Sequence, residues 1–255
     1  LMREIARLRE VSFRAVGEGC GKRRDTDRFD MHYQHMVLWD EEDMEVVGAY
    51  RWRATGEGGQ PCVAVSELYS HELFGFTDAF TPVLAQGLEL GRSFIQPKYW
   101  GRRSLDYLWY GIGAYLKTRP DIRYLFGPVS ISQAYPPHAL AMLVYFYSHY
   151  FPSMAFSANA RLPYRIDAEK QLELSRMFNA GNYQDDFCTL KDQLQQMGLA
   201  VPTMYKQYTE LCERGGVEFI DFNVDPAFAN CIDGLVVVDL QKVKKAKLNR
   251  YMCGE

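Results

Sequence analysis

Apolar side chains recur every three or four residues in six stretches of the chain, with charged and polar residues between them. This spacing predicts amphipathic helices. The first helix begins at Met2, and Gly17 ends it. The other predicted helices lie at 102–116, 136–150, 168–178, 185–197 and 203–214.

Shorter runs rich in β-branched and aromatic residues predict strands, because turn residues separate them. Residues 33–39 and 45–53 flank an acidic turn at 40–43, so we expect them to form an antiparallel hairpin. Further strands are predicted at 62–69, 88–95, 122–131, 217–222 and 235–240. Helices and strands in this order predict a fold that contains both element types, of the α/β (α+β) class.

The length of 255 residues and the hydrophobic content of 47% favour one domain with one sizeable core. We therefore expect a single domain over 1–255, with a helical segment at about 168–214 inserted before the last strands. A start at Leu1 suggests a fragment of a longer polypeptide.

Charge and hydropathy exclude several classes of partner. The formal net charge is −3, so no field attracts a polyanion, and we expect no nucleic-acid partner. The longest apolar runs, such as 139–146, are far shorter than the ~20 residues that span a bilayer. These features predict a soluble protein and leave peripheral contact with the inner face of a membrane open.

The six cysteines show neither a CxxC pair nor a Cys/His spacing typical of a metal site. Scattered cysteines of this kind indicate reduced thiols in place of a disulfide framework. We therefore expect a cytoplasmic location and no bound metal.

The most informative stretch is the predicted strand with Glu-Leu-Gly-Arg-Ser at 89–93, which leads into a basic turn before a helix. Free amides and the helix dipole at such a turn attract an anion. An ordinary basic loop explains the same pattern equally well. The residues that would bind a phosphate here are Ile95, Lys98, Gly101, Arg102, Arg103 and Ser104.

These motifs resemble the GNAT acyltransferase superfamily, and most closely its branch that makes ornithine and other amino-acid lipids, often labelled hemolysin-like. The resemblance covers about 5–250 and implies a GNAT-like fold with a mixed, mostly antiparallel sheet flanked by helices. One departure is that the turn contains only Gly101, where the family has more glycine. Further matching stretches lie at 27–30, 127–130 and 202–208.

The resemblance also implies a donor. The Glu-Leu-Gly-Arg pattern is similar to acyl-homoserine-lactone synthases, which favours the phosphopantetheine thioester of acyl-carrier protein over acyl-CoA as co-substrate. No permanently bound cofactor is implied. The donor arm is expected in a V-shaped gap between strands 88–95 and 122–131.

Amide formation from a thioester needs a base for the amine, an oxyanion donor and a proton for the thiolate. We assign these roles to Glu89, to a backbone amide near Phe94, and to Tyr147 or Tyr145. Alternation along a strand disfavours an ion pair between Glu89 and Arg92 unless a bulge intervenes. A packed core tyrosine is an equally good interpretation of either tyrosine.

The acceptor is implied to be an amino acid. Arg28 and Asp30 match positions that hold its charged groups in related families, although Asp30 also suits a helix cap. His32, Arg92 and Ser130 complete the candidate substrate site, while a structural role is the competing interpretation of His32.

These residues predict an N-acyltransferase that moves a (3-hydroxy)fatty acyl group from acyl-carrier protein to the α-amine of an amino acid such as ornithine. The alternatives are an acyl-homoserine-lactone-type synthase and a non-catalytic, membrane-active, hemolysin-like protein.

Overall fold

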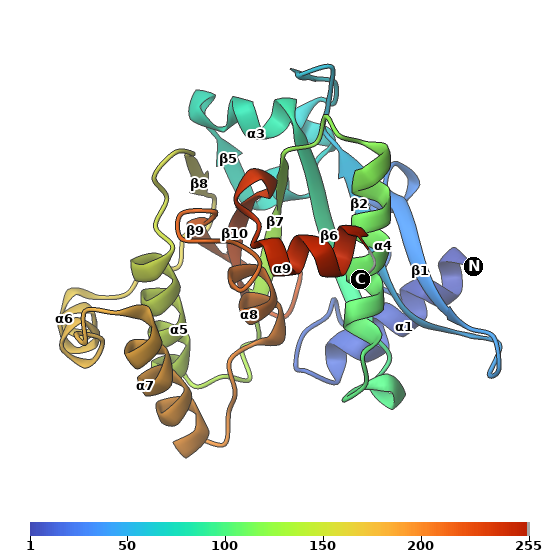
Figure 1. Cartoon of the computed structure of the whole chain (residues 1–255). Helices are drawn as coiled ribbons and strands as arrows, with labels where there is room; N and C mark the ends of the chain where they lie inside the picture. Colours follow the sequence, from blue (N-terminus) through green and yellow to red (C-terminus); the bar gives the residue numbers. More distant parts are fainter. Residues whose placement is uncertain (254–255) are drawn as a thin grey trace.

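The computed structural model describes residues 1–253, and its centre is a six-stranded sheet of order β1-β2-β6-β7-β10-β9 (Figure 1). All neighbours are antiparallel except β6 and β7, which run parallel. The prediction of a mixed, mostly antiparallel sheet is confirmed. The strands are β1 (Gln34–Asp40), β2 (Glu45–Ala54), β6 (Gly87–Ile95), β7 (Tyr124–Ile131), β9 (Val217–Asp225) and β10 (Cys231–Asp239).

Two small antiparallel sheets lie beside the main one, formed by β3 (Gly56–Glu57) with β4 (Gln60–Pro61) and by β5 (Phe74–Phe76) with β8 (Ala158–Ala160). The helices are α1 (Met2–Arg14), α2 (Ser70–Leu73), α3 (Thr81–Ala85), α4 (Ser104–Thr118), α5 (Pro137–Tyr150), α6 (Ala168–Met177), α7 (Tyr183–Gln196), α8 (Thr203–Thr209) and α9 (Lys245–Leu248).

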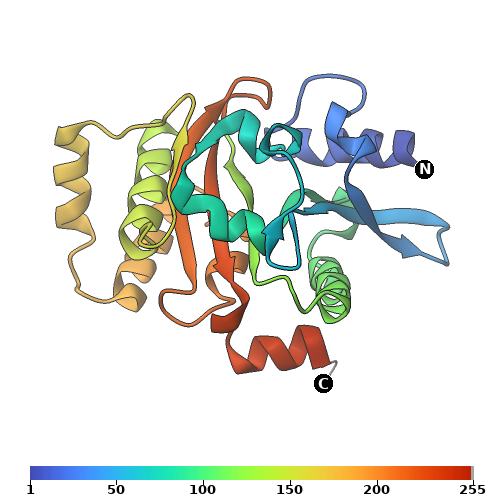
Figure 2. The same ribbon diagram turned by 90° about the horizontal axis from the view of Figure 1, so that it is seen from above.

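Helices cover both faces of the sheet. Helix α1 buries Ile5 and Leu8 against Val46 of β2 and Phe94 of β6. Helix α4 packs on β1 and β2 from the opposite face, as Figure 2 shows. Burial of apolar surface on both sides fixes the central strands between the helices.

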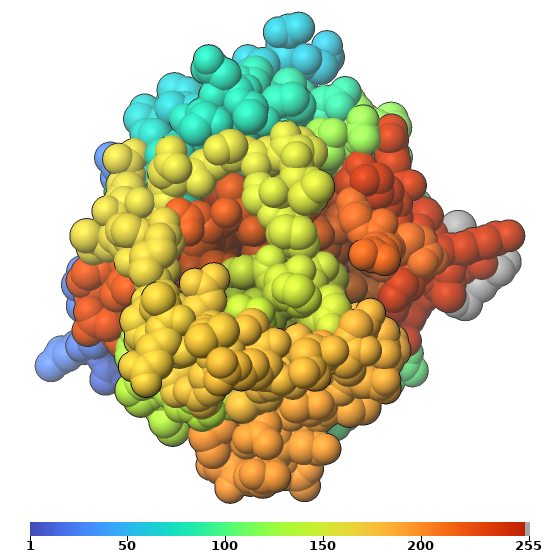
Figure 3. Space-filling model, turned by 90° about the vertical axis from the view of Figure 1, so that its left-hand side faces the viewer, coloured from blue at the N-terminus to red at the C-terminus, as the bar shows by residue number. Residues whose placement is uncertain are grey.

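Helix α5 is apolar on most of its surface because it lies between β9 and the helices α6 and α7. In Figure 3, α6 and α7 (gold to orange) form the lower part of the molecular face seen from the left of Figure 1. These two helices are polar on their outer side, which explains their weaker hydrophobic pattern in the sequence.

The prediction of a strand at 62–69 is wrong, because this segment forms a short 3-10 turn at Val65–Glu67 followed by α2. Strand β2 already pairs with β1 on one side and β6 on the other, so this segment cannot pair beside the strand that precedes it. Its backbone amides bind side chains instead: the Tyr69 amide donates to the Tyr33 hydroxyl at 2.8 Å.

Two predicted boundaries also differ. Helix α8 ends at Thr209 and not at 214, since the chain turns there to bring Cys212 beside Val243. Strand β10 begins at Cys231, four residues before the predicted start. Asp233 and Gly234 interrupt the apolar run of this buried strand, so the sequence pattern indicates only its second half.

A bulge interrupts β6. Arg51 of β2 is opposite Gly91 and Ala49 is opposite Phe94, so two residues of β6 face one residue of β2. Arg92 lies in the bulge with φ of 50°. A bulge reverses the alternation of side chains. Arg92 therefore points to the face opposite Leu90, whereas strict alternation would place these two side chains on the same face.

No helix among residues 1–253 combines the length and the apolar character needed to cross a membrane. Cys20, Cys62, Cys188, Cys212 and Cys231 are free thiols, as the sequence predicted for scattered cysteines.

Candidate active site

The two parallel strands β6 and β7 part in the middle of the sheet. They pair only from Gly87 to Glu89 on β6. At the parting point Gly127 is the residue that allows close approach, because a Cβ there would lie 2.1 Å from the Leu90 carbonyl oxygen. Beyond it, residues 90–95 and 128–130 line a cavity of about 630 Å³.

One end of the cavity is the turn before α4. Gly101 has φ of 75°, which suits glycine, and Ser104 begins a helix whose first turn has no side-chain cap. Gly101, Arg102 and Ser104 all line the cavity. The uncapped amides and the guanidinium make this end attractive to an anion.

Lys98 and Arg103, which the sequence hypothesis included in the phosphate site, lie outside the cavity. Lys98 pairs with Asp43 at 3.0 Å and with Glu45. Arg103 is exposed and lies 3.7 Å from Asp106, one turn along α4. Their charge is directed to neighbouring carboxylates and solvent, and not into the gap.

Backbone direction along β6 decides which amide faces the gap. The Gln96 amide donates to the Val47 carbonyl at 2.8 Å, and alternation directs the Phe94 amide to β2 as well. Ile95 points the other way, since its carbonyl accepts a bond of 2.8 Å from the Trp100 indole. The amide of Ile95, and not that of Phe94, is therefore available to a molecule in the gap.

At the other end of the cavity the chain leaves α1 in a tight turn. The Gly17 amide donates to the Arg14 carbonyl and the Glu18 amide to the Phe13 carbonyl, while Gly17 has φ of 77°. This pattern is a Schellman ending, which requires glycine at that position. It projects Glu18 into the cavity.

The Glu18 carboxylate accepts a hydrogen bond of 3.0 Å from the Ser130 hydroxyl of β7. Burial raises the pKa of Glu18 to about 7, although the Ser130 hydrogen bond and the charge of Arg92 act in the opposite direction. A carboxylate with such a pKa can accept and release a proton near neutral pH.

Asp233 and Arg92 also line this end. Burial, and next the charges of Asp225 and Glu18, raise the pKa of Asp233 well above its usual value. Burial therefore favours the neutral form of Asp233. The Arg92 guanidinium lies over the Tyr69 ring at 4.5 Å and pairs with Asp25 at 3.0 Å.

A buried ion network under α1 supports this region. Arg9 pairs with Asp25 at 2.8 Å and with Asp30 at 2.9 Å, and Arg51 pairs with Asp30 at 2.7 Å. Burial opposes ionisation of Asp30, but Arg9 and Arg51 outweigh it and hold the pKa at about 2. Asp30 is thus a permanently charged structural group.

The acceptor residues proposed from the sequence do not meet at the cavity. Asp30 is bound within the network, whereas Arg28 is exposed and pairs with Glu72 at 3.0 Å. His32 is exposed at the end of the 3-10 turn Arg28–Met31. Asp27 and Asp30 cap that turn reciprocally, which corresponds to the competing capping interpretation. Only Arg92 and Ser130 of this set line the cavity.

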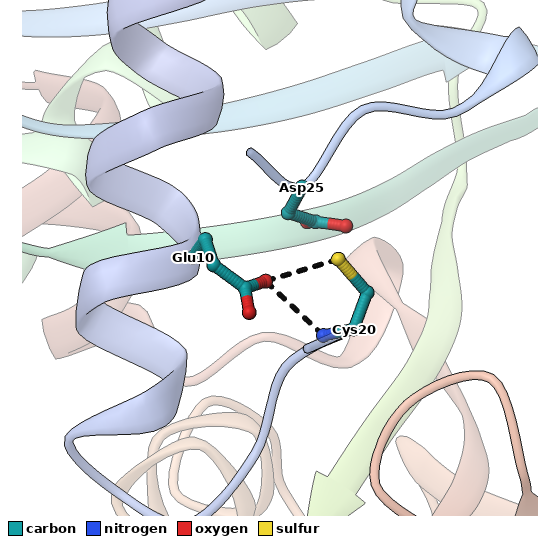
Figure 4. Close-up of side chains that lie close together, drawn as sticks. All are labelled: Glu10, Cys20 and Asp25. Atoms are coloured by element: carbon teal, nitrogen blue, oxygen red, sulfur yellow. Dashed lines mark hydrogen bonds between the residues drawn. The ribbon is translucent and has the colours of Figure 1, made fainter. Parts of the chain in front are cut away.

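The loop after α1 has a further anchor, shown in Figure 4. Glu10 accepts bonds of 3.1 Å from both the amide and the thiol of Cys20. Glu10, Cys20 and Asp25 place ligand-type atoms within 4.8 Å of one another. Asp25 already binds two guanidinium groups, whose positive charge opposes a cation, so this cluster supports the loop that carries Glu18.

Glu89 belongs to β6, but its side chain is fully buried and does not line the cavity. Its carboxylate accepts bonds of 2.6 Å from the amide and hydroxyl of Ser70 and another bond from Tyr33. It makes no ion pair with Arg92, even though the bulge that could have allowed one is present. This geometry ties α2 to the sheet and leaves the predicted base without access to an amine in the gap.

The candidate tyrosines on α5 are also separated from the cavity. Tyr147 is fully buried against Tyr205 and Phe219, and its hydroxyl has no partner among the described residues. Tyr145 stacks on His149. The tyrosines that do line the cavity include Tyr50 and Tyr208, whose hydroxyls are 2.7 Å apart.

Sequence reasoning missed Glu18 and Asp233. The signal for Glu18 was a carboxylate between two glycines directly after a helix, a place where the backbone is fixed. The signal for Asp233 was an acidic residue inside an otherwise apolar strand. Neither signal identifies the partner across the gap.

Known proteins resemble this chain in sequence. A family model described as an acetyltransferase (GNAT) domain matches residues 8–110. Glycine N(alpha)-acyltransferases of Phocaeicola vulgatus and Bacteroides thetaiotaomicron are 30% and 31% identical over 227 residues, which cover 83% of this chain and 68% and 66% of those proteins. The chain belongs to the GNAT acyltransferase family. The gap where β6 and β7 part is the candidate active site of this acyltransferase.

An L-ornithine N(alpha)-acyltransferase of Rhodobacter capsulatus is 30% identical over 193 residues, covering 69% of this chain and 70% of that protein. The chain thus spans about two thirds of the length of these three relatives. A solved CoA-dependent acyl-homoserine lactone synthase, MesI, matches 91% of this chain and 75% of its own with 11% identity and a TM-score of 0.40.

Proposed function

We propose that this GNAT acyltransferase moves a fatty acyl group from a thioester to the α-amine of an amino acid. The observation that carries the proposal is that one cavity extends from the anion-attracting turn at Arg102, between the parted strands, to the carboxylate of Glu18. A phosphate-bearing thioester arm and an ammonium group suit these opposite ends. The names of the relatives support an amino acid as the acceptor.

The donor arm would bind as an added strand beside β6, with the Ile95 amide as a hydrogen-bond donor. The attacking amine turns the thioester carbonyl oxygen into an oxyanion, and an amide aimed into the gap stabilises that charge. The acyl chain would lie against the apolar wall of the cavity near Val201 and Met204. We propose acyl-carrier protein or coenzyme A as the source of the arm.

Glycine and ornithine are the acceptors to test first, because relatives are named for both. Purified protein is incubated with long-chain and 3-hydroxyacyl thioesters of carrier protein and of coenzyme A, together with one amino acid at a time. Free thiol release and product mass are recorded. Amine-dependent release with an N-acyl amino acid supports the proposal, a lactone product supports a homoserine-lactone synthase, and no turnover with any thioester contradicts both.

A steric variant tests the location. Gly91 lines the gap, and a Cβ there meets no atom within 4 Å, so Gly91→Val adds bulk without a backbone clash. We expect kcat/KM for the thioester to fall at least ~10-fold. Gly75→Val in β5 is the matched control, since its Cβ also has room and it lies outside the cavity. Equal activity of both variants would place the donor elsewhere.

A further inference from the structure

The carboxylates near the end of α1 differ in whether they have a positively charged partner. Glu10 binds Arg14 and Cys20, and Asp25 and Asp30 bind guanidinium groups. Glu18 has no ion pair among the described residues, although its side chain is partly buried. An unpaired carboxylate in such a place lowers stability, and this is typical of a group that meets a ligand.

Glu18 also lies where a reacting amine has room. Its partner Ser130 is three residues beyond Gly127, where the strands part, which corresponds to about 10 Å along an extended strand. At this depth residues of β6 and β7 line the open cavity and no longer pair. The carboxylate is held there by one hydrogen bond from the wall, and its other oxygen is left for a ligand.

We propose that Glu18 is the catalytic base of the acyl transfer and binds the ammonium group of the acceptor. This inference rests on the proposed function. The Glu18 carboxylate takes one proton from the ammonium, and the neutral nitrogen attacks the thioester carbonyl carbon. The C–N bond forms and the C–S bond breaks. The second proton on nitrogen goes to the departing thiolate, and Glu18 releases its proton to solvent.

The groups around Glu18 support this assignment. Ser130 and Arg92 favour the ionised form, and burial favours the neutral one, so the pKa stands at about 7. The other ionisable groups within its electrostatic reach are Asp233, Cys231, Tyr135 and Tyr205. Burial raises the pKa of each of these four and favours their neutral forms, so Glu18 is the group of this set whose charged form is available to an ammonium.

The test compares pH profiles of kcat/KM for wild type and Glu18→Gln. We expect the variant to lose ~100-fold or more at pH 7 and to recover as pH rises toward 9, because the free amine then needs no base. Glu218→Gln is the matched control: this buried glutamate accepts amide bonds from Met154 and Ala155 and lies outside the cavity. We expect its profile to follow wild type.

Glu18→Asp keeps the carboxylate and should retain more activity than Glu18→Gln at pH 7. If the Gln variant keeps the wild-type profile, or if its loss is the same at every pH, Glu18 is not the base. A variant that does not fold is replaced by Glu18→Asp, whose acidic limb must move relative to wild type.

A second readout separates this inference from the proposed function. In wild type labelled with ¹³C at glutamate carboxyl carbons, the resonance missing from Glu18→Gln is titrated with and without glycine or ornithine. Titration near pH 7 that shifts when an amino acid is added supports the ammonium site even if no thioester turns over. Titration near 4.5 with no response to either amine overturns it.

Discussion

The Ser130 hydroxyl donates a 3.0 Å hydrogen bond to the carboxylate of Glu18, although 112 residues separate the two in sequence. This bond joins the turn after α1 to β7 across the mouth of the gap. It fixes the position of the carboxylate and favours its ionised form. Several expected properties of the protein depend on this pair.

Ser130→Ala removes that bond, so the pKa of Glu18 should rise further above its usual value. The acidic limb of the kcat/KM profile is then expected to move to higher pH by roughly 0.5–1 unit, since a net hydrogen bond contributes about 1 kcal/mol. Activity at pH 7 falls several-fold and returns at pH 9. Ser175→Ala on α6 is the control and should leave the limb in place. An unmoved limb in Ser130→Ala would contradict a role of this bond in catalysis.

Glu18→Gln should change stability as well as activity. The folded pKa is raised to about 7 from 4.5, so between these values the folded protein keeps a proton that the unfolded chain has lost. Wild type therefore loses stability as pH rises through this window, and the variant does not. We expect the variant to gain about 1–3 kcal/mol above pH 7 and nothing near pH 4, with partial exposure of Glu18 limiting the gain. Urea unfolding at both pH values measures the difference.

Tyr147→Phe separates a core tyrosine from a catalytic one. The hydroxyl is buried without a partner among the described residues, and loss of an unsatisfied polar group is neutral or stabilising. The free energy of unfolding should stay equal or rise by up to ~1 kcal/mol, and kcat should not change. A loss of kcat with folding intact would restore the sequence hypothesis that Tyr147 protonates the thiolate.

The turn before α4 should distinguish its basic residues. Arg102 lines the cavity, whereas Lys98 is engaged by Asp43 and Glu45. Arg102→Ala is expected to raise KM for a phosphopantetheine thioester ~5- to 10-fold with little change in kcat, because one charge contact to a phosphate is lost. Lys98→Ala should leave KM unchanged. Equal effects of the two variants would mean that the phosphate binds outside the cavity.

Local pattern was sufficient for much of this fold. The apolar spacing of α1, α4 and α5, the acidic turn of the β1–β2 hairpin and the strand at 88–95 follow from sequence alone, because helix and strand periodicity are properties of neighbouring residues. The GNAT family and the acyltransferase class were also predicted and are confirmed.

The tertiary structure decided where the charged groups point. A bulge sends Arg92 to the face opposite Leu90, and Glu89 ends behind the sheet with Tyr33 and Ser70. Asp30 is enclosed by Arg9 and Arg51, while Glu18 receives Ser130 from β7. The sequence alone does not indicate whether a carboxylate will contact a guanidinium group or face an open cavity. Its partner comes from a distant segment, and only the folded chain brings the two together.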